Sequence, residues 1–165
     1  MIDTGSTYRT RVVVTAILAW GAGLALQAMV FRYVLAHWDE VLVSVRAKHI
    51  SGQEIGEALT RDLYTALLYV FLLTGVLLLV LLPVVVRRSK AAAIGIVALA
   101  APYAAVGVFM QVRSLVTDWA TSRDTAPALS HVGPEWMRWS NTVGGLLITV
   151  GAIATIAVLC SRRRS

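Results

Sequence analysis

The chain has 165 residues, of which 58% are hydrophobic and only 15% are charged. Its mean hydropathy of +0.73 is too high for a water-soluble globular domain of ordinary composition. The net charge of +6 would suit a nucleic-acid-binding protein, but the basic residues gather at the ends of apolar runs, which argues for a membrane protein and against nucleic acid as a partner.

Four apolar runs follow one another along the chain, at about residues 12–36, 63–86, 91–113 and 141–160. Each is close to the ~20 residues that a helix needs to cross the hydrocarbon of a bilayer. The loops between them are too short for a water-soluble domain, and no internal repeat is visible. We therefore predict an all-α integral membrane protein in which residues 1–165 form one domain, a bundle of four transmembrane helices.

The first run, 12–36, follows Arg9 and Arg11 as the apolar part of a signal peptide would. It is roughly twice as long as such a part, so we interpret it as an uncleaved first span. Trp20 lies inside this span rather than at the headgroup level that tryptophan prefers, which predicts that it packs against a neighbouring helix.

Residues 37–62 form the longest polar stretch, and an apolar helical period enters it from both sides. Ser51 and Glu54 match a capping box, which predicts that a new helix begins shortly after Gly52. We predict an outward helical hairpin that extends the first two spans, with Val45 opposite Ile55, Leu42 opposite Leu59 and Trp38 opposite Leu63. An amphipathic helix on the outer surface and an irregular loop are the alternatives. The residues of the hairpin that would dock a partner are Trp38, Leu42, Val45, Ile55 and Leu59.

The second run, 63–86, carries bulky side chains almost all round, so we expect it to be the span most exposed to lipid or to a partner. The other three runs carry small residues at helical spacing, which let helices approach closely in lipid. These residues are Ala16, Ala19 and Gly23; Ala100, Ala104 and Gly107; and Gly144, Gly151 and Thr155.

Two prolines mark local structure in the second half of the chain. Pro102 lies in the middle of the run 91–113, where it removes one backbone hydrogen bond and predicts a helix kink, with either a structural or a functional role. Pro134 suits the first turn of the helix that enters the membrane as the fourth span.

The distribution of charge predicts the orientation in the membrane. Eight basic residues share one side of a four-span chain with a single acid, Asp3, whereas the other side and its span ends carry seven basic and eight acidic residues. By the positive-inside rule both termini are cytoplasmic. The cytoplasmic cations would also attract anionic lipid. Thirteen Arg against two Lys, with abundant Ala and Val, indicate a bacterial source, so we expect the bacterial inner membrane. The eight basic residues are Arg9, Arg11, Arg87, Arg88, Lys90, Arg162, Arg163 and Arg164.

The predicted spans contain no Asp, Glu, His or Lys, the residues that most often mark function inside a membrane. Arg32 and Arg113 lie near the outer ends, where long side chains can reach water. Alternatively they would line an outward-facing anionic pocket together with Gln27, Gln111 and Asn141.

No residue pattern indicates catalysis or a cofactor. Outer-side candidates for a metal exist, but separate loops would have to bring them together, and no HxxH, HExxH or CxxC spacing supports them, so we predict no metal site. Signatures of nucleophilic hydrolases and nucleotide-binding proteins are also missing. The metal candidates are His37, His131, Asp39 and Asp118.

Three functions remain open from the sequence. The first is a non-catalytic accessory or assembly subunit that binds another membrane protein through its membrane helices and outer protrusions. The second is a small transporter or channel formed by self-association. The third is a membrane enzyme that acts on lipid, which no specific residue supports.

Overall fold

The computed structural model describes residues 4–40, 43, 54–87, 89–120 and 134–161. Four long helices account for almost all of them: α1 (Thr4–Ala36), α3 (Glu54–Val86), α4 (Lys90–Ala120) and α5 (Glu135–Ser161). Side chains are described for these residues except 4–9, 54–60, 110, 111 and 113–120. The prediction of an all-helical chain with four long apolar helices is confirmed.

Each helix contains a segment that is long and apolar enough to cross a membrane: Thr10–Ala36, Arg61–Val86, Lys90–Phe109 and Glu135–Ser161. The shortest has 20 residues, which is about 30 Å of helix and matches the hydrocarbon thickness. The chain is thus a multi-pass membrane protein. All four helices extend beyond the predicted spans: α1 begins at Thr4, α3 begins at Glu54, α4 continues to Ala120 and α5 begins at Glu135.

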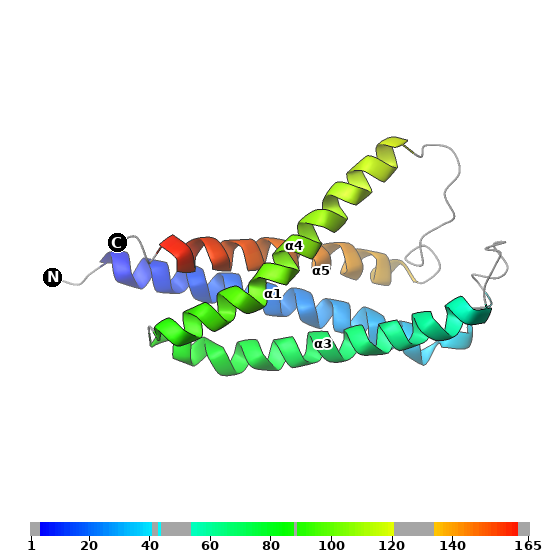
Figure 1. Ribbon diagram of the computed structural model, residues 1–165, viewed down its shortest axis with the longest axis horizontal. Helices are drawn as coiled ribbons and strands as arrows, with labels where there is room; N and C mark the ends of the chain where they lie inside the picture. The colour runs from blue at the N-terminus through cyan, green and yellow to red at the C-terminus, as the bar shows by residue number, and fades with distance from the viewer. Residues whose placement is uncertain (1–3, 41–42, 44–53, 88, 121–133, 162–165) are drawn as a thin grey trace.

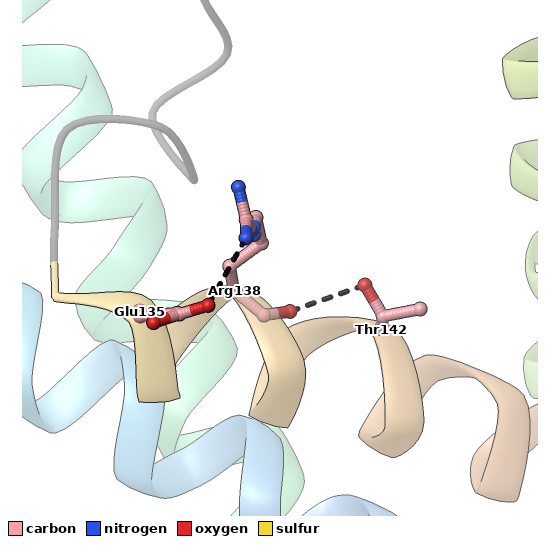
Figure 2. A network of polar contacts seen from close by, with 3 residues as sticks. All are labelled: Glu135, Arg138 and Thr142. Carbon is pink, nitrogen blue, oxygen red and sulfur yellow. Dashed lines mark hydrogen bonds and ion pairs between the residues drawn. The ribbon is translucent and has the colours of Figure 1, made fainter.

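Polar residues define the helix ends. Ser89 lies in the short link between α3 and α4, and its Oγ accepts a hydrogen bond from the backbone N–H of Ala92 at 3.4 Å, which caps α4. Pro134, which we predicted in the first turn of the fourth span, directly precedes α5, and its carbonyl accepts the N–H of Met137 at 2.9 Å. Figure 2 shows the first turns of α5, where Arg138 lies 3.5 Å from Glu135 and its carbonyl accepts the Thr142 hydroxyl.

The helices are not packed equally. α1 packs most extensively on α5 and next on α3, whereas α4 packs on α5 and only slightly on α3. In Figure 1, α1 lies between α5 and α3, α4 crosses them obliquely, and the yellow-green second half of α4 points away from the other three helices. The start of α1, the end of α5 and the link from α3 to α4 lie at the same end of the molecule.

Small residues make the contacts of α5, as predicted. A Cβ added at Gly23 of α1 would lie 2.7 Å from the carbonyl oxygen of Gly144, and one added at Gly151 would lie 2.7 Å from the backbone nitrogen of Trp20. A Cβ at Gly107 of α4 would overlap the hydroxyl of Thr149. These three glycines therefore allow α1 and α4 to approach α5 more closely than any side chain would permit.

The core lies where these helices meet, and Trp20 is at its centre with no exposed surface. This confirms that Trp20 packs within the chain. A second, smaller cluster lies toward the other end of the bundle, where Trp38 and Met137 join Val30 and Val34. α3 contributes least to the interior: only 17% of its apolar segment is buried, against 44% for α1, so the second span is the most exposed of the four, as predicted.

Candidate functional site

The predicted anionic pocket was to form between α1, α4 and α5. Two of its members are close: Gln27 is buried, and its Nε2 donates to the backbone carbonyl of Asn141 at 2.8 Å. This bond ties α1 to α5 and uses one N–H of the Gln27 amide. Arg32 is exposed. The side chains of Gln111 and Arg113 lie outside the described part of α4, so the pocket itself stays a prediction.

The metal candidates are described only in part. The ring of His37 stacks on Tyr33 with the ring centroids 4.2 Å apart, and its Nδ1 lies 3.0 Å from the Tyr33 carbonyl oxygen. Asp39 is exposed in the same segment. Among the described residues, no three His, Cys, Asp or Glu side chains lie close enough together to hold a metal ion. His131 and the side chain of Asp118 fall outside that part of the chain.

Of the residues predicted to dock a partner, only the Trp38 side chain is described. It is 8% exposed and packs within the chain against Tyr64 of α3, with the ring centroids 6.1 Å apart. Leu63, which we had placed opposite Trp38, is 55% exposed, so the residue that faces Trp38 is its neighbour Tyr64. The structure does not describe Leu42 and Val45 or the side chains of Ile55 and Leu59. Their role in docking a partner stays a prediction.

Helices α3 and α4 both continue through a proline. Pro102 is exposed in α4, and Pro83 lies near the end of α3. Each removes a donor from the carbonyl four residues earlier, that of Ala98 or Leu79. A functional role of Pro102 stays a prediction.

The structure contains a row of aromatic side chains that no sequence pattern indicated. It runs from Trp20 at the centre of the core to Trp38, with each ring centroid 5.2–6.1 Å from the next. Helices α1, α3 and α4 all contribute, so the row depends on how the helices are rotated against one another. Its members in order are Trp20, Tyr103, Phe71, Phe31, Tyr64 and Trp38.

The buried polar groups beside this row are bonded within the chain, with one exception. The hydroxyls of Thr74 and Tyr103 lie 2.7 Å apart and join α3 to α4. Thr149 and Thr155 donate to carbonyls one turn earlier in α5. Within the described residues, Trp20 Nε1 is the buried side-chain nitrogen without a partner. These contacts stabilise the bundle, and among the buried side chains that the structure describes they leave only that indole N–H without a hydrogen-bond partner.

The most extensive unoccupied surface of the described chain lies on α3. Exposed apolar residues follow one another there at alternating intervals of three and four, the spacing with which a helix presents a seam to another helix. We refer to these residues as the α3 stripe: Leu63, Ala66, Val70, Leu73, Leu77, Val80 and Val84. The heptad spacing is visible in the sequence, but only the packing shows that this side of α3 is uncovered.

The chain matches no protein-family model, and its comparison with curated proteins and with solved structures finds no match. The surfaces described above are therefore the basis for the function.

Proposed function

We propose that this protein is a non-catalytic accessory subunit of a bacterial inner membrane, and that it binds another integral membrane protein through the α3 stripe. The observation that carries this proposal is the uneven covering of the four helices. α3 has the most apolar segment of the four and the least buried one, with 17% of it inside the bundle.

The dimensions of the α3 stripe suit a transmembrane helix of a partner. From Leu63 to Val84 the stripe covers 21 residue steps, or about 32 Å, which is the thickness of the hydrocarbon. Its spacing of three and four residues allows left-handed packing at a crossing angle of about +20°, the commonest arrangement in membrane bundles. A partner helix would thus contact the stripe along the whole bilayer.

A transporter or channel within a single chain has less support. Its polar route would need buried groups that are free to bind a solute, but in the described bundle the buried Thr and Gln side chains are bonded to neighbouring helices or to their own. Self-association remains the alternative that the experiment must separate from a foreign partner.

Photocrosslinking in the native host tests the proposal. A benzophenone side chain at Leu73, Leu77 or Val80 should form a discrete adduct with one other membrane protein. Leu72 and Leu79 are matched controls, because they are equally apolar and exposed but lie on the side of α3 that faces α1. Adducts with a second copy of the chain would support a homo-oligomeric transporter or channel instead, and adducts with lipid alone would contradict the proposal.

The orientation of the four spans is part of the same proposal, with both termini in the cytoplasm. The support is the charge asymmetry, eight basic residues and one acid on the side of the termini. In a Cys160→Ser background, cysteines at Ser51 and Ala126 should react with an impermeant thiol reagent in intact cells, whereas a cysteine at Ser89 should not. Labelling at Ser89 would reverse the orientation.

We also propose the outward hairpin above α1 and α3 as a second contact for the partner. The packing of Trp38 on Tyr64 supports it, because it brings the two helices together at the base of this segment. In the register predicted from the sequence, cysteines at Val45 and Ile55 should form a disulfide more readily than cysteines at Val45 and Gly56, since adjacent residues point about 100° apart around a helix. A preference for Gly56 would show that the one-residue shift found at Tyr64 continues along the hairpin. Equal crosslinking of both pairs would contradict the hairpin.

A substitution tests whether the hairpin contacts the partner. Leu42→Asp should release the partner, and Ser44→Asp should not.

A further inference from the structure

Helices α1 and α3 leave an apolar groove between them, on the other side of α3 from the stripe. Its volume is about 400 Å³, and every lining side chain is apolar. Leu24 and Leu78 are buried at its floor, whereas Leu18, Leu72, Val76 and Leu79 are exposed at its rim. The groove is therefore open along one side to the hydrocarbon of the membrane.

Two glycines show that the groove is free space rather than a helix contact. A Cβ added at Gly21 of α1 or at Gly75 of α3 would meet no atom within 4 Å, although both residues line the groove. At Gly23, two residues from Gly21, the same Cβ would lie within 3 Å of α5. Packing of this chain thus explains the glycine at 23 and leaves the glycines at 21 and 75 facing an unfilled volume.

The size of the groove limits its occupant. It extends from Ile17 to Ala28 along α1 and from Phe71 to Leu82 along α3, 11 residue steps on each helix, or about 16 Å. A single hydrocarbon chain is narrow enough. The groove lies in the middle of the span Thr10–Ala36, so it would hold the inner part of an acyl chain that enters from one side of the membrane.

The charge at one end of the groove indicates which class of lipid the hydrocarbon chain belongs to. Arg11 precedes Ile17 by six residues, about 9 Å along α1, and Arg87 follows Leu82 by five residues, about 7.5 Å along α3. Both arginines are exposed, and Arg11 lies two turns from Leu18 and so near the face of α1 that lines the groove. A phosphate held at their level would have its acyl chain enter the groove.

We propose that the groove between α1 and α3 is a binding site for an anionic phospholipid, with one acyl chain between the helices and the phosphate beside Arg11 and Arg87. The buried hydrocarbon supplies the affinity, and the two cations favour an anionic headgroup over a zwitterionic one. The site lies on the opposite side of α3 from the α3 stripe and does not depend on whether a protein binds the stripe.

Native mass spectrometry of the full chain, released from nanodiscs of phosphatidylglycerol and phosphatidylcholine, tests this proposal. The wild type should retain one phosphatidylglycerol molecule in preference to phosphatidylcholine. Filling the groove with Gly21→Leu and Gly75→Leu should lower this retention at least tenfold. Gly95→Leu is the matched control, since a Cβ at Gly95 of α4 also meets nothing within 4 Å and this residue does not line the groove.

The headgroup is tested separately. Arg11→Gln and Arg87→Gln should each reduce the preference for phosphatidylglycerol by about fivefold while leaving acyl-chain retention intact. Ala22→Leu at the exposed rim repeats the filling experiment should the double variant be unstable in a thermal melt.

Three results would overturn the site. Unchanged lipid retention in both filled variants would show that the groove does not hold the lipid, and equal retention of the two lipids by the wild type would remove the headgroup contact. A homodimer lost on filling would show that a second copy occupies the groove. All three are measured on the purified chain, so none depends on the partner protein proposed above.

Discussion

Helix α1 contacts α5 on one side and α3 on the other, and the two interfaces are built differently. On the α5 side, Gly23 and Gly151 bring backbones together so closely that a single methyl group would not fit. On the α3 side, Gly21 and Gly75 face empty space, and aromatic rings at one end hold the helices together. Glycine therefore has different structural roles at the two interfaces. It allows close helix contact on the α5 side and leaves room for a ligand on the α3 side.

The largest effect should come from the centre of the close interface. Trp20→Ala should lower the free energy of unfolding by about 3–5 kcal/mol, because it removes a fully buried side chain and leaves a cavity. Phe31→Ala, on the α3 side and only half-buried, should cost less than half as much. Unfolding in mixed detergent micelles measures both. Trp139→Ala, at an exposed position of α5, is the control. A larger loss of unfolding free energy for Phe31→Ala than for Trp20→Ala would contradict this prediction.

Gly151→Ala should be the next most damaging change. The added methyl group would lie 2.7 Å from the Trp20 backbone nitrogen, so α1 and α5 must separate, at a cost of about 1–3 kcal/mol. Gly145→Ala in the same helix should be tolerated, because its Cβ would be 3.9 Å from the nearest atom, Gln27 Nε2. The two variants should therefore have different melting temperatures. Equal melting temperatures would show that α1 and α5 accommodate the added methyl group without loss of stability.

The polar contact between α3 and α4 should contribute less. A double-mutant cycle with Thr74→Val and Tyr103→Phe should give a coupling energy of about 0.6 kcal/mol, the average for hydrogen bonds between membrane helices. A coupling of zero would mean that the two hydroxyls do not bond in the membrane.

The smallest effect, with the opposite sign, is expected in the groove. Gly21→Ala and Gly75→Ala should leave stability unchanged or raise it by about 0.5 kcal/mol or less, because alanine is the better helix former and nothing is displaced. The same melts provide the measurement. A loss comparable to that of Gly151→Ala would show that these glycines also support close packing.

Several features were predictable because they depend on one helix at a time. Long apolar runs define the four helices, and small residues at helical spacing mark the faces that meet at Gly23, Gly144 and Gly107. The burial of Trp20 followed from its position in mid-span. The extra length of α3, which begins at Glu54, agreed with the capping box at Ser51 and Glu54.

Other features depend on how helices are rotated against each other, which a single sequence does not determine. Gly21 and Gly23 look alike in the sequence, but one faces the groove and the other faces α5. Tyr64 rather than Leu63 meets Trp38, because the register of two helices was estimated from levels alone and not from rotation. The aromatic row requires three helices in register, so no pattern within any one of them reveals it.

The pairing of α1 with α5 also bears on how the chain is made. The most extensive interface joins the first helix to the last, so Trp20 and Gly23 contact residues that follow them by more than 100 positions. During synthesis α1 enters the membrane long before Gly144 and Gly151 exist, and its glycine face has no partner until translation is nearly complete. Contacts of such high sequence separation form slowly. Truncation before α5 should therefore leave α1 without the helix that buries it. We expect membrane proteases to degrade such a truncated chain.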